Sequence, residues 1–184
     1  MKKTIYPSRI KGKVAIPASK SHTIRAVLIA SMAEGKSVLH FPLESQDTLA
    51  AVRACQALGA SVEMEPDKWT IKGTGGNLGR PATPIDVGNS GTTLYLLAGI
   101  AALADFPISF TGDMQIQKRS AAPLLNSLQD LGVRIESTSG GYAPFTIQGP
   151  LQGGTTSIEC PTSQYLSSLL LAAPLARNNT EIEV

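Results

Sequence analysis

The chain has 184 residues, of which 42% are apolar and 16% are charged, a composition that indicates a protein with a folded core and excludes a disordered one. The formal net charge of +2 gives no bulk electrostatic reason to expect a nucleic-acid or membrane partner. Two cysteines, Cys55 and Cys160, are too few for a disulfide scaffold, and the longest apolar stretch, 94–104, is too short to span a bilayer, so we expect a cytoplasmic protein.

The first third of the chain predicts the element order β-α-β-α-β-β. A strand is expected near Val14–Ile16, followed by a helix from about Ser21 to Glu34 that Gly35 ends. Ser45 or Asp47 is suited to cap the second helix of this unit. The remaining elements are a strand near Ser37–His40, that second helix from about Asp47 to Leu58, and a pair of strands that ends at Gly73.

The middle third repeats this order. The segment Leu131-Gly132-Val133-Arg134-Ile135-Glu136 matches Leu58-Gly59-Ala60-Ser61-Val62-Glu63, and each glycine fits the left-handed position that follows a helix. A period of about 70 residues is too long for a solenoid and indicates a duplicated supersecondary unit. The second copy is expected to contain a strand near Ile85–Val87, a helix from about Gly91 to Leu103, a strand near Ile108–Phe110, a helix from about Ala121 to Leu131, and two strands.

A third copy begins with a strand near Thr156–Glu159, a helix from about Ser163 to Ala173 and a strand near Glu181–Val184. The helix and strand pair that close the earlier copies do not follow, so we expect a truncated or split polypeptide; a natural domain of two and a half units is the alternative. The sequence therefore predicts an α/β (α+β) fold of repeated β-α-β-α-β-β units around a pseudo-threefold axis, at about 13–80, 81–150 and 151–184, with the third unit incomplete.

In each unit the first strand runs into a helix through a small polar loop, at 17–22, 88–93 and 161–164. A helix N-terminus has unpaired N–H groups and a partial positive charge, and small residues there let a phosphate or carboxylate come close. One serine or threonine at a helix start usually serves only as a cap. Three such starts, related by a pseudo-threefold axis, can converge on a single anionic ligand.

Four motifs lie at or near these loops. They are Pro17–Ala26 with its Ser-Lys-Ser core, Gly88–Thr92, Gly112-Asp113 followed by Arg119, and Thr162–Leu166 followed by Ala173–Ala176. In this order and spacing they resemble the EPSP synthase (3-phosphoshikimate 1-carboxyvinyltransferase) family, and the resemblance covers nearly the whole chain.

The resemblance implies an enzyme of two domains, each built from three such units, with substrates in the cleft between them. This chain would be the shikimate-3-phosphate-binding domain, 13–184, and residues 1–12 would pack with a C-terminal domain that lies outside this sequence. The implied reaction transfers the enolpyruvyl group of phosphoenolpyruvate to the 5-hydroxyl of shikimate 3-phosphate and releases phosphate, on the pathway to chorismate and the aromatic amino acids. No metal or other cofactor is implied, glyphosate is the family's inhibitor, and the chain alone is expected to be an inactive half-site.

The resemblance also assigns roles to individual side chains. Lys20 would act in catalysis and contact both substrates, and Gln164 would also reach both. The expected contacts of shikimate 3-phosphate are Lys20, Ser21, Arg25, Thr162, Ser163 and Gln164. The expected contacts of phosphoenolpyruvate are Lys20, Asn89, Gly91, Arg119 and Gln164. Asp47 is expected to be a helix cap, and Cys55 a core residue.

The chain departs from the family pattern at Tyr95, where an arginine is usual, and loss of that cation is expected to weaken phosphoenolpyruvate binding or change inhibitor sensitivity. The related transferase family that acts on UDP-N-acetylglucosamine usually has a catalytic cysteine in the loop that here spans Gly112–Ser120, and this loop has none. A non-catalytic anion-binding or assembly domain on the same scaffold is the alternative from another class. The combination of Lys20, Arg25, Arg119 and Gln164 argues against that alternative.

Overall fold

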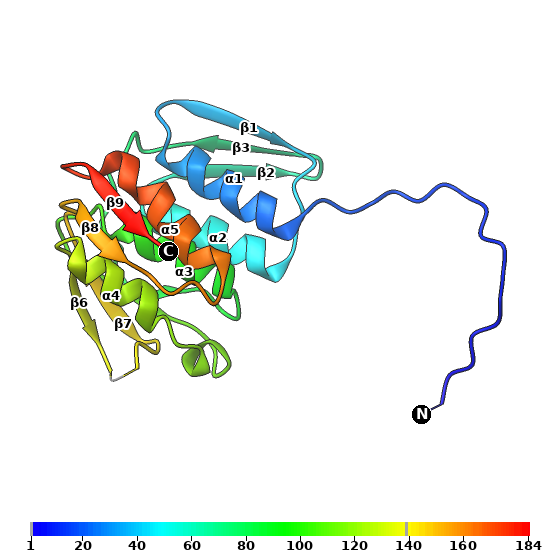
Figure 1. Cartoon of the computed structure of the whole chain (residues 1–184). Helices are drawn as coiled ribbons and strands as arrows, with labels where there is room; N and C mark the ends of the chain where they lie inside the picture. Colours follow the sequence, from blue (N-terminus) through cyan, green and yellow to red (C-terminus); the bar gives the residue numbers. More distant parts are fainter. Residues whose placement is uncertain (1, 139) are drawn as a thin grey trace.

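The computed structural model describes residues 2–138 and 140–184, and within them the helices and strands follow the repeated order that the sequence predicts, except near the N-terminus (Figure 1). The first unit contains α1 (Lys20–Met32), β1 (Lys36–His40), α2 (Gln46–Ala57), β2 (Ser61–Glu65) and β3 (Lys68–Lys72). The second contains β4 (Ile85–Asp86), α3 (Gly91–Ala101), β5 (Ile108–Thr111), a 3-10 turn (Ile116–Lys118), α4 (Ala122–Asp130), β6 (Arg134–Ser137) and β7 (Phe145–Gln148). The third contains β8 (Gly154–Ser157), α5 (Ser163–Ala172), a 3-10 turn (Ala173–Leu175) and β9 (Thr180–Glu183).

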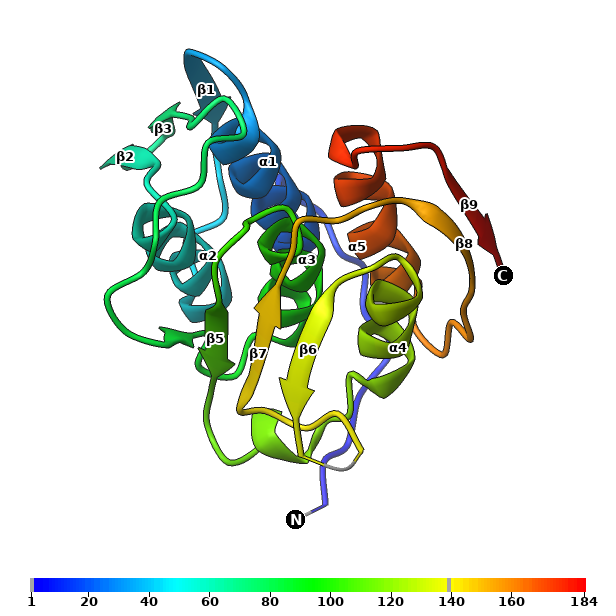
Figure 2. The same cartoon turned by 90° about the vertical axis from the view of Figure 1, so that its left-hand side faces the viewer.

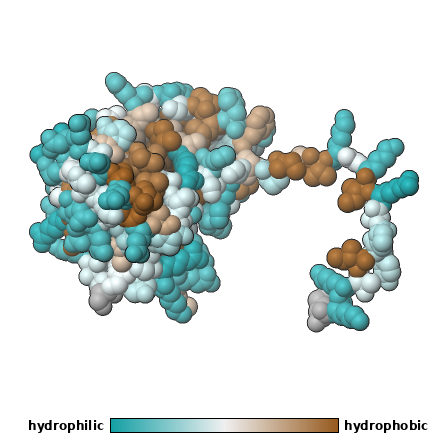
Figure 3. Space-filling model, viewed as in Figure 1, coloured by the Kyte–Doolittle hydropathy of each residue, from teal (hydrophilic) through white to brown (hydrophobic). Residues whose placement is uncertain are grey.

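The prediction of a strand near Val14–Ile16 was wrong. Residues 2–17 form no helix or strand, and Val14 and Ile16 are 81% and 84% exposed. A strand needs a neighbour for its backbone N–H and C=O groups, and this segment runs away from the body of the molecule with nothing beside it (Figure 1). Along this arm apolar side chains, including Ile5 and Ile10, alternate with basic ones on the surface (Figure 3).

The sheets retain the internal repeat. In the first unit the strand order is β1-β3-β2, and in the second it is β4-β5-β7-β6, so the antiparallel trio β5-β7-β6 has the same arrangement as β1-β3-β2. The parallel pair β4–β5 has its counterpart in the parallel pair β8–β9 of the third unit. Only the first unit lacks a described parallel strand, because the predicted strand at 14–16 does not form.

Helix α3 lies at the centre of the molecule, in contact with α1, α2, α4 and α5 (Figure 2). All of its residues are buried, which explains why its sequence, Gly91 to Ala101, is apolar on every side. The largest buried side chains of the sheets, Trp69 on β3 and Phe110 on β5, belong to the same core. Cys55 of α2 is 2% exposed, as predicted, and burial raises the pKa of its thiol to about 12, so this cysteine is an inert core residue.

Glycine ends helices where the repeat predicts it. Gly59 and Gly132 have φ of +100° and +87°, the left-handed conformation that glycine adopts without strain, and each directly follows the last turn of a second helix. Ser45, not Asp47, is the N-cap of α2. Its hydroxyl accepts a hydrogen bond from the Thr48 N–H, and the Thr48 hydroxyl accepts one from the Ser45 N–H. Among the described residues, no helix is both long and apolar enough to cross a membrane.

Helices α3 and α5 approach each other closely in the core. The Ser168 hydroxyl accepts the Gly99 N–H at 3.0 Å and donates to the Tyr95 carbonyl at 2.6 Å, so it is inserted into the backbone hydrogen bonds of α3. A Cβ at position 99 would overlap the Ser168 carbonyl oxygen and lie 2.7 Å from its hydroxyl. The contact therefore depends on the missing side chain of Gly99.

We expect Gly99→Ala to lower the free energy of unfolding by about 1–3 kcal/mol or more, because backbone must move to admit the methyl group. Urea unfolding followed by circular dichroism measures the loss. Gly12→Ala is the matched control, because nothing lies within 4 Å of its added Cβ. Equal stability of the two variants would contradict the proposed contact.

Candidate functional site

The starts of α1, α3 and α5 are capped by hydroxyl side chains, as the three polar loops predict. Ser19 accepts the His22 N–H at 3.4 Å, Ser90 accepts the Thr93 N–H at 3.3 Å, and Thr162 accepts the Gln164 N–H at 3.4 Å. These hydroxyls thus satisfy backbone groups at the helix ends. The positive ends of the three helices are kept in well-defined positions by these caps.

The three helix starts converge on one open cavity of about 580 Å³. Of the nine predicted site residues, six line it: Lys20, Asn89, Gly91, Arg119, Thr162 and Gln164. They come from all three units, so segments far apart in the sequence form one surface. The other lining residues are Asp47, Thr92 and Tyr95.

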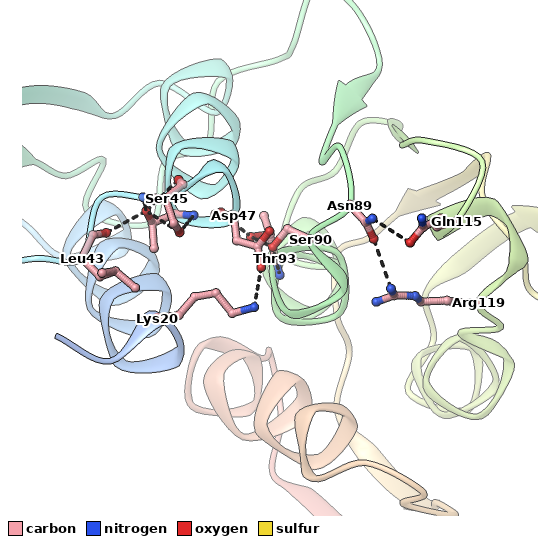
Figure 4. A network of polar contacts seen from close by, with 10 residues as sticks. Lys20, Leu43, Ser45, Asp47, Asn89, Ser90, Thr93, Gln115 and Arg119 are labelled. Carbon is pink, nitrogen blue, oxygen red and sulfur yellow. Dashed lines mark hydrogen bonds and ion pairs between the residues drawn. The ribbon is translucent and has the colours of Figure 1, made fainter. Parts of the chain in front are cut away.

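Asp47 is the lining residue that sequence reasoning misjudged. It was expected to be a helix cap, but it lies in the first turn of α2 and its carboxylate is 2.6 Å from the Lys20 ammonium (Figure 4). The Thr93 hydroxyl donates to the Asp47 backbone carbonyl at 3.3 Å, which ties the start of α2 to the start of α3. The repeat in the sequence did not indicate this ion pair, because only the first helix of each unit was expected to reach the site and Asp47 lies on a second helix.

Arg119 approaches the start of α3 from the other side of the cavity. Its guanidinium donates to the Asn89 side-chain oxygen at 3.1 Å, and the Asn89 amide nitrogen donates to Gln115 at 2.9 Å (Figure 4). A Cβ on Gly91 would be 3.1 Å from an Arg119 nitrogen, so a glycine at this position leaves room for the guanidinium. Lys20 and Arg119 therefore place two cations around one helix N-terminus.

Three predicted site residues, Ser21, Arg25 and Ser163, do not line the cavity. Arg25 is half-buried and donates to the Ser21 carbonyl and the Ser167 hydroxyl, each at 3.3 Å. The Ser163 carbonyl accepts from Ser167 at 2.9 Å. These contacts connect the first turns of α1 and α5 beside the cavity, so a ligand that used Arg25 would have to replace them.

Two aromatic rings support the wall behind Arg119. Tyr95 and Tyr165 meet edge to face with centroids 4.9 Å apart, and the Tyr165 hydroxyl donates to the Ser120 carbonyl at 2.7 Å. Burial raises the pKa of the Tyr165 phenol above its usual range, and Tyr95 beside it adds to the rise. This bond fixes the backbone next to Arg119.

No group of three or more His, Cys, Asp or Glu side chains that could hold a metal ion occurs in residues 2–138 and 140–184. Most of the groups around the cavity are of the kinds that bind anions. They are helix N-termini, an ammonium, a guanidinium and amide side chains, which are the groups that bind phosphate and carboxylate.

Comparison with known proteins gives consistent matches. The family profile described as EPSP synthase (3-phosphoshikimate 1-carboxyvinyltransferase) matches residues 5–184. A 3-phosphoshikimate 1-carboxyvinyltransferase from Acetivibrio thermocellus is 51% identical over 98% of this chain, and one from Methanococcoides burtonii is 44% identical over all of it. The chain spans 43% of the length of each of these relatives.

A solved structure of EPSP synthase from Acinetobacter baumannii superposes with a TM-score of 0.86 and 32% sequence identity. The match covers 93% of this chain and 40% of that protein. The predicted fold class, with its repeated units, is thereby confirmed.

We expect Tyr165→Phe to lower the free energy of unfolding by about 1 kcal/mol at neutral pH, because the Ser120 carbonyl loses its donor. The folded state holds the Tyr165 proton more tightly than the unfolded state, so this contribution is complete below the unfolded pKa of about 10 and is lost as the pH rises above it. The deficit of the variant relative to the wild type should therefore shrink above about pH 10.

Urea unfolding at a series of pH values measures this difference. Tyr6→Phe is the control, because Tyr6 is 77% exposed, and it should match the wild type throughout. A deficit for Tyr165→Phe that is constant or widens at high pH would count against the buried, hydrogen-bonded phenol.

Proposed function

Because this chain belongs to the EPSP synthase family, we propose that it forms one side of an active site that transfers the enolpyruvyl group of phosphoenolpyruvate to the 5-hydroxyl of shikimate 3-phosphate, with release of phosphate. The observation that carries the proposal is the convergence of three helix starts with Lys20, Arg119 and Gln164 on a single cavity of about 580 Å³.

Phosphoenolpyruvate is assigned to the side of the cavity at the start of α3. Gly91 and Thr92 line this side, where the positive end of the α3 dipole favours an anion, and Arg119 offers a planar pair of donors to a carboxylate or phosphate. Asn89 already accepts one Arg119 bond, so it orients the guanidinium before the ligand arrives. Tyr95 adds an aromatic wall here without a charge.

Shikimate 3-phosphate is assigned to the side between the starts of α1 and α5. Thr162 and Gln164 line the cavity there, while Ser21, Arg25 and Ser163 lie just beside it. Arg25 now bonds a carbonyl and a hydroxyl, both neutral, and a phosphate would be a stronger acceptor for its guanidinium. We therefore assign Arg25 to the phosphate of this substrate after a local exchange of partners.

We assign Lys20 to both ligands, because it lines the cavity that they would share. Two polyanions held side by side repel each other, and a cation between them offsets this repulsion. In the reaction the 5-hydroxyl oxygen loses its proton and bonds to C2 of phosphoenolpyruvate while C3 gains a proton. The tetrahedral intermediate then breaks its C2–O bond to phosphate and loses a proton from C3, so charge moves during the reaction. An ammonium on a flexible stem can follow that movement better than a fixed guanidinium.

The resemblance implies that the family's general acid and base residues belong to a second domain, and no residue of this chain is matched to them. We therefore propose that residues 13–184 bind the substrates' phosphate groups without turning them over, and that residues 2–12 pack with that second domain. The exposed alternation of apolar and basic side chains in the N-terminal arm supports the latter (Figure 3). We also propose a cytoplasmic location, because both cysteines are unpaired thiols and a reducing compartment keeps thiols in that state.

We expect this chain to bind shikimate 3-phosphate saturably, with binding weakened at least about tenfold in Lys20→Ala and in Gln164→Ala, because each loses a direct contact to a charged group. Amide chemical shifts or calorimetry measure the affinity. Lys68→Ala is the control, because Lys68 lies at the start of β3, outside the lining of the cavity, and pairs there with Glu65.

The expected pattern is wild-type affinity in the control and weak binding in both site variants. Absence of saturable binding by the wild type, or unchanged affinity in Lys20→Ala, would overturn the proposed half-site. Product formation by this chain alone would overturn the assignment of acid–base chemistry to another domain.

A further inference from the structure

The ion pair between Lys20 and Asp47 is a contact that the proposed roles leave unexplained. Lys20 is expected to bind anionic ligands, yet its ammonium lies 2.6 Å from a carboxylate inside the same cavity. We infer that Asp47 is a positioning residue that holds the Lys20 ammonium in the ligand-free site and competes with the incoming anion for it. The inference rests on the proposed function only in requiring that an anion binds in this cavity.

Asp47 is the fixed member of the pair. It lies in the first turn of α2, whose start is secured by the reciprocal bonds of Ser45 and Thr48. Its own carbonyl accepts the Thr93 hydroxyl from α3, and its carboxylate is well placed near the positive end of α2. The backbone of Asp47 is therefore held by two helices, and its short side chain leaves the carboxylate little freedom to move.

Lys20 is the movable member. It is the first residue of α1, its side chain is 48% exposed against 24% for Asp47, and four rotatable carbons separate its charge from the backbone. Without a partner this side chain would sample many conformations. The contact with Asp47 restricts it to the gap between the starts of α1 and α3 (Figure 4).

The charges around the cavity set the Asp47 carboxylate in competition with an anionic ligand for the Lys20 ammonium. Among the lining residues Lys20 and Arg119 are positive and Asp47 is negative, so an anion between the two cations also meets a carboxylate. Like charges at such short range repel, and the ligand must draw Lys20 away from Asp47. Removing the Asp47 charge while keeping its shape should then strengthen anion binding and free Lys20.

The simpler view is that Asp47 only stabilises the start of α2. In that case its replacement would lower stability and leave both Lys20 and ligand affinity unchanged. Two measurements on Asp47→Asn separate the views, with Asp47→Ser as a second variant in case the first folds poorly. Glu65→Gln is the matched control, because Glu65 holds Lys68 at 3.0 Å in a comparable pair on the surface of the β1-β3-β2 sheet.

The first measurement needs no ligand: brief labelling of lysines with acetic anhydride, quantified by mass spectrometry. A carboxylate contact shields the nitrogen from the reagent, so Asp47→Asn should speed labelling of Lys20 by about two- to fivefold, the range set by exposed ion pairs, and leave Lys68 unchanged. Glu65→Gln should speed labelling of Lys68 and leave labelling of Lys20 unchanged. Unchanged Lys20 labelling would overturn the inference that Asp47 holds Lys20 in solution.

The second measurement is a titration with inorganic phosphate followed by amide chemical shifts. Asp47→Asn should bind phosphate about two- to tenfold more tightly than the wild type, and most of this gain should vanish in a Lys20→Met background. Equal or weaker binding by Asp47→Asn would overturn the competition while leaving the proposed function in place. Failure of the wild type to bind phosphate in a Lys20-dependent way would overturn both.

Discussion

The burial of α3 is the constraint on which the rest of the structure depends. A helix with no exposed residue must be surrounded on all sides, and α1, α2, α4 and α5 provide that cover. The Ser168 hydroxyl, inserted beside Gly99, fixes α5 against α3 with no space for adjustment. Because protein cores are close-packed, the start of α3 becomes a fixed point, and the starts of α1 and α5 are fixed relative to it.

This rigid arrangement explains how a chain with a net charge of only +2 can present an anion site. The charges that matter are local: two cations and three helix N-termini around one cavity. Each cation has an internal partner, since Lys20 bonds Asp47 and Arg119 bonds Asn89. These partners keep the two flexible side chains in place, and preorganised groups bind with less loss of conformational entropy.

Much of the fold could be predicted from the sequence because the same order of helices and strands occurs in two successive segments. The glycines after α2 and α4 and the hydroxyl caps before α1, α3 and α5 are local signals, and local signals survive folding. The strand predicted near Val14–Ile16 failed because alternating apolar residues show only that a segment can pair, not that a partner is beside it. Asp47 was misjudged for a related reason: its role depends on Lys20, 27 positions earlier in the chain, and no local pattern joins them.

The two complete units show how a duplicated unit can become asymmetric at its functional end. The first turn of α2 delivers a carboxylate to the cavity through Asp47, whereas the segment before α4 delivers a guanidinium through Arg119. Two neighbouring but non-equivalent positions thus place opposite charges around one helix N-terminus. A symmetric pair of cations there would leave Lys20 without a partner and would repel it. The carboxylate on the α1 side therefore allows a third charged group, Lys20, to remain close to the centre of the site.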